Sequence, residues 1–283
     1  MGSAFIRRFE SSVKNTLQRY SLASRGDLVL VACSGGKDST TVLNILHALG
    51  YDVEAIHIDL GIGAWSKANK ANIESFCEGR GIPMHAASTR ECLGFSVCYL
   101  KSSLQQKTCL SACSICGVIK KWVLNRKAKE LGADRLATGH NLDDEARTLM
   151  MNVINGNPDL CLHSRPKREG RGKLFVPRIK PLYFASEDSI KRYSMEMGFH
   201  VLYERCPCSK DSFGRGIYDE VGRLGRYVPD IKDNMVKSSL WLQHRCRKGE
   251  SESARACRLC GEPSRAGVCR TCSMLFQLRN DKE

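Results

Sequence analysis

A short loop with two glycines, placed between a strand-like run and a helix-like run, constrains this chain most strongly. Residues 28–32 (LVLVA) are apolar and rich in β-branched side chains, as a buried parallel strand is. Residues 34–39 (SGGKDS) follow at once, and apolar residues from Val42 to Leu49 then repeat at helical spacing. Two glycines let the backbone approach an anion closely, and the amides at a helix start attract phosphate. The loop therefore predicts a phosphate-binding site, although it lacks the spacing of a Walker A motif.

Strand-like and helix-like segments alternate along the first 200 or so residues. The further strands that we expect are 53–58, 82–86 and 134–138, and the further helices are 5–24, 71–80, 115–131, 143–154 and 186–198. This alternation predicts an α/β fold in which helices cover both faces of a parallel sheet. Ligands of such sheets bind at the carboxyl ends of the strands, so the loop 34–39 and the turn 139–141 are expected to lie there.

The pattern divides the chain into four expected parts. They are an N-terminal helix (1–26), a nucleotide-binding domain (27–205), a connecting segment (206–245) and a small cysteine-rich module (246–283). Residues 163–173 (HSRPKREGRGK) are polar, basic and rich in turn formers, so we expect an exposed loop there.

Charge and cysteine content narrow the class of function. The net charge is +14, from 44 Lys and Arg against 30 Asp and Glu, which favours a polyanion such as nucleic acid as a partner. No apolar run approaches the 20 or so residues of a membrane-spanning helix, and no signal peptide is recognisable, so we expect a cytoplasmic protein without membrane contact. Fifteen cysteines in a reducing compartment point to metal, iron–sulfur or thiol chemistry rather than to disulfides.

The pair Cys113 and Cys116 opens a predicted helix. Residues at positions i and i+3 lie on one helix face, where two thiolates can hold one metal centre. Zinc and a redox dithiol are alternatives to an iron–sulfur cluster. A third cysteine from Cys206-Pro207-Cys208 would leave one iron of a [4Fe–4S] cluster open to substrate or hydrosulfide.

Two further cysteine pairs lie near the C-terminus. Eight residues separate the two CxxC pairs, a pattern typical of a tetrahedral zinc knuckle. We expect structural zinc on Cys257, Cys260, Cys269 and Cys272.

Three motifs together carry a family resemblance. Residues 33–39 (CSGGKDS) resemble the pyrophosphate loop of the N-type ATP pyrophosphatases, the PP-loop superfamily. Residues 57–62 (HIDLGI) and 138–146 (TGHNLDDEA) extend the resemblance to the tRNA 2-thiouridine synthetases of the TtuA/NcsA type, with TtcA-type 2-thiocytidine enzymes as relatives. The resemblance implies a PP-loop fold, cleavage of ATP between its α and β phosphates, and adenylation of the substrate. TtuA-type proteins usually carry an additional N-terminal zinc knuckle, and because residues 1–32 hold no Cys or His we expect it to be absent here.

The resemblance also assigns residues. It implies that ATP and Mg²⁺ are bound by Ser34, Gly35, Gly36, Lys37, Asp38, Ser39, Asp59, Gly139 and Asp143. It implies catalytic roles for Lys120, Asp144 and Asp59, with an ordinary helix cap as the alternative for Asp143. It matches Cys113 and Cys116 to cluster ligands and Cys206 best to the third, with Cys208 as the competing choice.

The resulting hypothesis is an ATP-dependent tRNA sulfurtransferase that adenylates C2 of a uridine and replaces its oxygen with sulfur. Alternatives are a 2-thiocytidine-forming enzyme, a tRNA-modifying ligase that uses nitrogen, and a non-catalytic zinc RNA-binding protein. A ubiquitin-like thiocarboxylate protein or free sulfide would donate sulfur, a homodimer is common among relatives, and the modified tRNA position stays open. We expect RNA phosphates to contact Arg165, Lys167, Arg168, Arg171 and Lys173.

Overall fold

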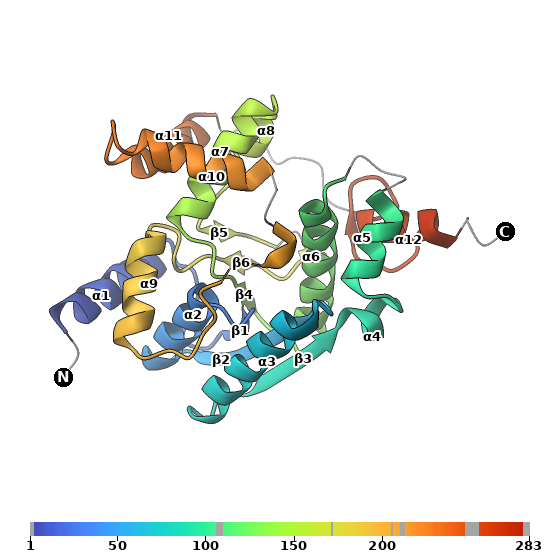
Figure 1. The fold of residues 1–283 in the computed structure, drawn as a ribbon, viewed down its shortest axis with the longest axis horizontal. Helices are drawn as coiled ribbons and strands as arrows, with labels where there is room; N and C mark the ends of the chain where they lie inside the picture. Colours follow the sequence, from blue (N-terminus) through green and yellow to red (C-terminus); the bar gives the residue numbers. More distant parts are fainter. Residues whose placement is uncertain are drawn as a thin grey trace.

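The computed structural model describes residues 3–105, 110–170, 172–204, 206–209, 213–246 and 255–279. Its centre is a six-stranded sheet in the order β3-β2-β1-β4-β6-β5 (Figure 1). The strands are β1 (Leu28–Ala32), β2 (Asp52–Asp59), β3 (Met84–Ser88), β4 (Arg135–Ala137), β5 (Lys167–Arg168) and β6 (Arg178–Ile179). Every pairing is parallel except that of β5 with β6. The expected α/β fold is confirmed.

Two details differ from the sequence-based expectation. The sheet is not wholly parallel, because β5 adds an antiparallel strand at its edge. That strand lies within 163–173, the segment expected to be only an exposed loop. A strand of two residues is too short to show a period of two in the sequence, so its pairing could not be predicted.

Helices cover both faces of the sheet. The helices of the first part are α1 (Ala4–Arg19), α2 (Lys37–Ala48), α3 (Gly63–Glu78), α4 (Thr89–Leu93), α5 (Val97–Gln105) and α6 (Ala112–Glu130). Those of the second part are α7 (Leu142–Ile154), α8 (Pro158–Cys161), α9 (Glu187–Glu196), α10 (Phe213–Leu224), α11 (Ile231–Arg245) and α12 (Arg270–Arg279), with short 3-10 turns η1 (Gly172–Leu174) and η2 (Pro207–Ser209).

Alternation along the strands separates two apolar layers. Val29 and Val31 face the side where α1, α2 and α9 pack, in one buried cluster. Leu30, Ile56 and Leu136 face the other side, where they meet buried residues of α6. Because each strand is buried on both faces, its sequence is a continuous apolar run rather than an alternating one.

The last part of the chain adds two layers of its own. Helices α10 and α11 pack against α7, through a cluster that includes Ile217, Val221 and Val236 (Figure 1). A small hairpin, β7 (Arg255–Ala256) with β8 (Pro263–Ser264), precedes α12 and lies beside α5 and α6. Within the described chain, no helix combines the length and apolarity needed to cross a bilayer.

The strand order places a switch point between β1 and β4. From β1 the chain builds outward through β2 and β3, whereas β4 and β6 extend the sheet on the other side. Ligands of open α/β sheets bind in the crevice beyond the strand ends at such a point. The loop 34–39 leaves β1 there, and the turn 139–141 leaves β4.

Candidate functional site

The loop 34–39 has a shape that only glycine permits. Gly35 has φ +81°, and a Cβ there would lie 2.3 Å from the carbonyl oxygen of Asn69 in α3. The Ser34 amide donates to Ser39 Oγ at 3.2 Å, and Ser39 Oγ donates to the Gly36 carbonyl at 3.2 Å. Gly36 is the N-cap residue of α2, and among the described residues no side chain accepts a capping hydrogen bond from the first amides of the helix. The first amides of α2 are therefore left to serve an anion, as a phosphate-binding loop requires.

The charged residues of this loop form a part-buried network. Lys37 Nζ lies 3.0 Å from carboxylate oxygens of both Asp38 and Glu187, the latter at the start of α9. Burial alone lowers the pKa of Lys37, but the two carboxylates outweigh it, so its pKa is raised and the residue stays cationic. Burial raises the pKa of Asp38 against the opposing effect of Lys37.

The turn after β4 packs directly on the start of α2. A Cβ at Gly139 would lie 2.8 Å from the Ser39 amide nitrogen and 2.9 Å from the Asp38 carbonyl carbon. Asn141 Nδ2 donates to Asp38 Oδ1 at 3.0 Å. The structure thus brings together the two turns that the sequence placed at one sheet edge.

Asp143 and Asp144 follow this turn in α7 but have different surroundings. Asp143 is 4% exposed, accepts the Glu187 amide at 2.8 Å, and forms an ion pair with Lys232 of α11. Both of its oxygens therefore contact protein groups. Asp144 completes a capping box with Asn141 and pairs with Arg147 at 2.8 Å. Burial raises the pKa of Asp144, and Arg147 opposes that rise.

Asp59 ends β2 at the same edge of the sheet. Its Oδ1 accepts the Gly61 amide at 2.8 Å, in a local turn that orients the carboxylate. Because the carboxyl ends of parallel strands share one edge, Asp59 lies at the edge of the sheet from which the loop 34–39 also leaves.

The cysteine pair at the start of α6 meets η2. Cys113 is exposed, Cys116 is half-buried, and Cys113 Sγ lies 4.0 Å from the carbonyl oxygen of Cys208. Burial raises the pKa of Cys116, while the nearby Lys120 ammonium lowers it and Cys113 and Cys208 raise it further. The structure therefore gathers these cysteines and Lys120, which is solvent-exposed one turn along α6.

The donor set near η2 suits a group larger than one ion. Burial raises the pKa of Cys206, which also interacts with Cys208 and Cys116. Cys113, Cys116 and Cys206 are described, yet their sulfurs are not all within 4.8 Å of one another. Two thiols of α6 and one from the residue before η2 form a three-cysteine donor set of the kind that ligates an iron–sulfur cluster.

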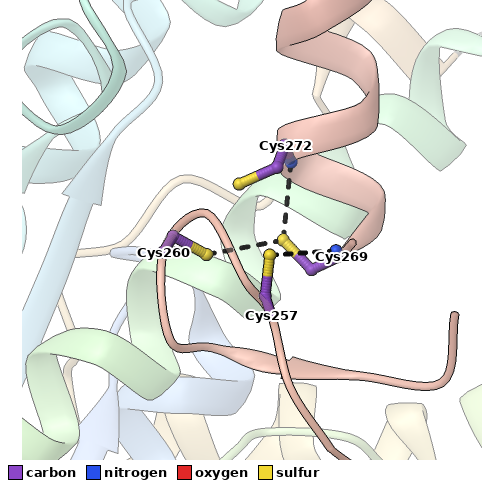
Figure 2. A group of neighbouring side chains, drawn as sticks. All are labelled: Cys257, Cys260, Cys269 and Cys272. Carbon is purple, nitrogen blue, oxygen red and sulfur yellow. Dashed lines mark hydrogen bonds between the residues drawn. The ribbon is translucent and has the colours of Figure 1, made fainter. Parts of the chain in front are cut away.

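The second set of cysteines is tightly gathered. Figure 2 shows the sulfurs of Cys257, Cys260, Cys269 and Cys272 facing one another, and all lie within 4.8 Å of each other. The amide of Cys269 donates to Cys257 Sγ at 3.2 Å. Burial raises the pKa of the Cys257 thiol, but amides of Cys269, Leu259 and Cys260 outweigh it and bring the pKa to about 6. These amides thus stabilise the thiolate of Cys257, the form that binds zinc, whereas burial and the neighbouring thiols raise the pKa of Cys269 and Cys272.

The knuckle is joined to α6 by polar as well as apolar contacts. Glu262 is 3% exposed, accepts a hydrogen bond from Asn125 Nδ2 at 2.7 Å, and pairs with Lys129. Cys257 and Cys269 are buried in the same cluster as Leu100 of α5 and Ile119 of α6. The described part of the expected C-terminal module therefore shares a core with the nucleotide-binding layers.

The residues expected to contact RNA have different structural surroundings and do not form a single exposed loop. Arg165 Nε donates to Gln243 Oε1 of α11 at 3.0 Å, and Lys167 pairs with Glu169 at 2.8 Å. Arg168 lies on β5 opposite Arg178 of β6. Arg171 and the side chain of Lys173 lie outside the described residues.

Sequence reasoning missed Arg178 and the partners of Lys180 and His140 on the same side of the sheet. Lys180 pairs with the buried Glu145 at 2.6 Å, and Arg178 Nη2 donates to the Lys121 carbonyl at 3.1 Å. Desolvation by its surroundings first, then Lys180 among other charges, lowers the pKa of His140 to about 4, although the residue is partly exposed to solvent, so this imidazole is neutral at pH 7. The spacing of Arg178 and Lys180 at i and i+2 was the one available signal that both face the same side.

Comparison with known proteins gives the family. A family model described as PP-loop domain matches residues 5–201. The chain is 32% identical over 269 residues to tRNA-5-methyluridine(54) 2-sulfurtransferase of Pyrococcus horikoshii. The aligned region covers 95% of this chain and 84% of that protein. It is 33% identical over 271 residues to the protein of the same name from Thermus thermophilus. This alignment covers 95% of this chain and 83% of the Thermus protein.

A solved structure agrees with the sequence relatives. The U34-tRNA thiolase NcsA from Methanococcus maripaludis, with its [4Fe-4S] cluster, superposes with a TM-score of 0.79 at 29% identity and covers 98% of this chain and 88% of its own. The family model, the relatives and the fold all point the same way. This chain belongs to the PP-loop family, in the group that contains the tRNA 2-sulfurtransferases.

Proposed function

We propose that this chain is an ATP-dependent tRNA sulfurtransferase that replaces the C2 oxygen of a uridine with sulfur. One observation carries the proposal: the phosphate loop 34–39 and the cysteines at the start of α6 open onto the same edge of the sheet. An enzyme that activates with ATP and then transfers sulfur needs both functions beside one substrate atom. The names of the relatives support uridine and tRNA as the substrate.

The first step uses the loop. The amides at the start of α2, together with Lys37, bind the phosphates of ATP, because a helix start favours negative charge. The uridine C2 oxygen attacks the α-phosphorus, a new P–O bond forms, and pyrophosphate leaves. Asp38 and Asp59 offer the carboxylate oxygens that Mg²⁺ prefers, so we assign Mg²⁺ to this end of the site.

In the second step, sulfide attacks C2; it is supplied free or is released from a thiocarboxylate donor when water cleaves the acyl C–S bond and leaves a carboxylate. The C2–S bond forms, the C2–O bond to the adenylate breaks, and AMP leaves with the oxygen. We assign Lys120 to neutralise negative charge at this centre, since its ammonium lies near Cys116. We assign Asp144 to hold a proton, because burial raises the pKa of its carboxyl.

Cys113, Cys116 and Cys206 would hold the [4Fe–4S] cluster that the family implies. With three protein ligands, such a cluster supplies one iron that can bind the sulfur to be transferred. The fold prepares this place: α6 presents Cys113 and Cys116 within the two turns before Lys120, and η2 contacts Cys113 through the Cys208 carbonyl.

Zinc and tRNA complete the proposal. The four cysteines of the knuckle would bind zinc, which would order a segment that has few apolar residues of its own. Arg165, Lys167, Arg168, Arg171 and Lys173 would add positive charge along the tRNA backbone. We place the reaction in the cytoplasm.

The test is a reconstituted reaction. Protein purified without oxygen is incubated with ATP, Mg²⁺, sulfide and unmodified tRNA, and digested nucleosides are analysed by mass spectrometry. We expect 2-thiouridine with the wild type and none with Cys113→Ala, while Cys161→Ala, which changes a half-buried cysteine of α8, stays active. Fragment mapping then assigns the position, with residues 34 and 54 of tRNA as the two that the relatives' names give.

Each alternative has its own outcome. If 2-thiocytidine forms instead, the substrate base is cytidine rather than uridine, and the proposed sulfur-transfer chemistry still holds. Full tRNA-dependent release of pyrophosphate without iron or sulfide would favour a ligase that uses nitrogen. Absence of pyrophosphate release with any tRNA, from protein that contains an intact cluster, would favour a non-catalytic RNA-binding protein.

A further inference from the structure

A group of cations lines the α6 side of the sheet beyond β4. Arg178 and Lys180 lie on one face of the β6 segment, while Ile179 between them is buried on the opposite face. Arg168 of β5 stands directly opposite Arg178 in the antiparallel register. Lys121 joins them from α6, where its carbonyl accepts the Arg178 guanidinium at 3.1 Å.

Few acidic groups among the described residues balance Lys121 and Arg178. Lys180 has a partner, since it lies 2.6 Å from the buried Glu145. Among the described residues, neither Lys121 nor Arg178 has a carboxylate partner, and the Nε of Arg178 is buried without a hydrogen-bond acceptor. Glu262, the acid that acts on Arg178 from a distance, is already engaged by Lys129.

The surroundings make this excess of charge costly. Burial, followed by the charge of Arg168, lowers the pKa of Arg178 to about 10. Partial burial, followed by Arg178, Arg168, Lys180 and Arg270, lowers the pKa of Lys121, part of whose side chain stays exposed to solvent. Like charges opposite each other destabilise a pair of strands, and a buried donor without an acceptor adds to that cost. An anion bound between these side chains would remove both penalties.

The position of the group indicates which anion binds. Lys121 follows Lys120 directly in α6, and the charges of Lys180 and Lys121 also reach His140 in the turn after β4. The group therefore adjoins the proposed reaction centre. Strand β4 separates it from the strand that carries the nucleotide loop, since β6 lies two strands from β1, roughly 10 Å away at the usual strand spacing.

We propose that Lys121 and Arg178 form a binding site for a phosphodiester group of the tRNA strand beside the target nucleotide. This inference rests on the proposed function, which supplies RNA as the substrate. A guanidinium matches the two free oxygens of a phosphodiester in geometry as well as charge, and Lys121 adds a point charge next to it. Such contacts fix the register of the strand without reading its sequence.

The experiment measures tRNA binding without turnover. Binding of unmodified tRNA to Lys121→Gln and Arg178→Gln is followed at several salt concentrations, with the holo protein kept free of oxygen. The affinity of the same preparations for an ATP analogue is measured in parallel. Arg126→Gln is the matched control, because Arg126 lies on the same helix, is exposed, and pairs with Glu130 at 3.0 Å.

We expect each variant to bind tRNA more weakly and to reduce the salt dependence of binding by about one unit of slope. Affinity for the ATP analogue should be unchanged, and Arg126→Gln should match the wild type. Arg178→Lys should recover part of the slope, which a purely structural role would not predict. If Arg178→Gln fails to fold, Lys121→Gln carries the test, since the Lys121 side chain is solvent-accessible.

Three results would overturn the proposal. Unchanged salt slopes in both variants, with a wild type that binds tRNA, would leave the proposed function standing and remove this site. A loss of affinity for the ATP analogue with tRNA binding intact would assign the cations to the nucleotide. A wild type that binds no tRNA at low salt would remove the proposed function and this site together.

Discussion

Asn141 Nδ2 donates a hydrogen bond to Asp38 Oδ1 at 3.0 Å, and this bond ties the turn after β4 to the first turn of α2. The two residues are 103 positions apart in the chain. The same Asn141 caps α7 through Asp144, so one side chain positions the phosphate loop relative to a proposed catalytic carboxylate. The geometry of the site therefore depends on close contact between two turns.

Gly139→Ala tests that contact. The added methyl would lie 2.8 Å from the Ser39 amide nitrogen, so the turn must move away from the loop. We expect a loss of about 1–3 kcal/mol in the free energy of unfolding and a weakened affinity for ATP. Denaturant unfolding and nucleotide titration measure the two effects. Gly222→Ala in α10, where a Cβ meets nothing within 4 Å, should be neutral or stabilising. An equal loss of stability and ATP affinity in that control would contradict a specific role for the Gly139 contact.

Asp143→Asn separates a structural role from a nucleotide-binding one. The carboxylate is buried and contacts both Lys232 and the Glu187 amide. Loss of its charge leaves Lys232 without its partner, and we expect about 2 kcal/mol less stability. ATP affinity of the folded variant should hold. The opposite result, unchanged stability with ATP affinity lost, would assign Asp143 to the nucleotide as the family resemblance implies.

Single substitutions of the cysteines test the ligand set near η2. We expect Cys113→Ala, Cys116→Ala and Cys206→Ala each to lose iron and the visible absorption of a cluster. Cys208→Ala should retain both, since Cys113 contacts the backbone carbonyl of Cys208, which the substitution keeps. Iron loss in Cys208→Ala with retention in Cys206→Ala would exchange the two roles. Cys246→Ala, at an exposed cysteine, serves as the control.

If the four cysteines of the knuckle bind zinc as proposed, its removal should change the packing around α6. Cys257 and Cys269 share a buried cluster with Ile119 and with Leu100 of α5, so release of the knuckle exposes that surface. We expect Cys269→Ser to lose bound zinc and to shift the fluorescence of Trp122, which is 9% exposed in the same cluster. A variant that loses zinc while Trp122 fluorescence and hydrogen exchange of α6 stay unchanged would show that the knuckle folds independently of α6.

The low pKa of His140 predicts a pH dependence. Its pKa is about 4 in the folded chain because of desolvation by its surroundings and the nearby Lys180, although the side chain is partly solvent-exposed, against about 6.5 for a free histidine. Between these values the unfolded chain binds more protons, so this residue lowers stability as the pH falls from 6.5 to 4. An NMR titration of the imidazole should show its midpoint near 4. A midpoint near 6.5 would contradict the placement, and His140→Gln should remove this part of the pH dependence.

The sequence predicted the central layers well for a physical reason. Residues 28–32 became β1 without a change of boundary, because a strand buried on both faces is a continuous apolar run. Helix α10 was missed because Gly214, Gly216 and Gly222 weaken its helical pattern, and it is held by packing of Ile217 and Val221 against α7 and its neighbours. Tertiary contacts there override local preference.

The site was predictable in its residue types and less so in its partners. The loop 34–39 and the turn 139–141 follow strands, so their meeting could be expected from topology alone. The approach of η2 to Cys113 joins residues 95 positions apart, and periodicity carries no signal for such a contact. The opposition of Arg168 and Arg178 depends on the register of two very short strands, which the sequence does not specify.

The close approach of Gly35 to the Asn69 carbonyl has a consequence for the thermodynamics of nucleotide binding. A loop held by α3 on one side and by the turn of Gly139 on the other has its shape before ATP arrives. Its residues therefore lose little conformational entropy when the phosphates dock, whereas a loop that folds around its ligand must order itself at that moment. The conformational entropy of the loop is lost when the chain folds, before ATP binds. Calorimetry of ATP binding should therefore report a small entropic penalty from the loop.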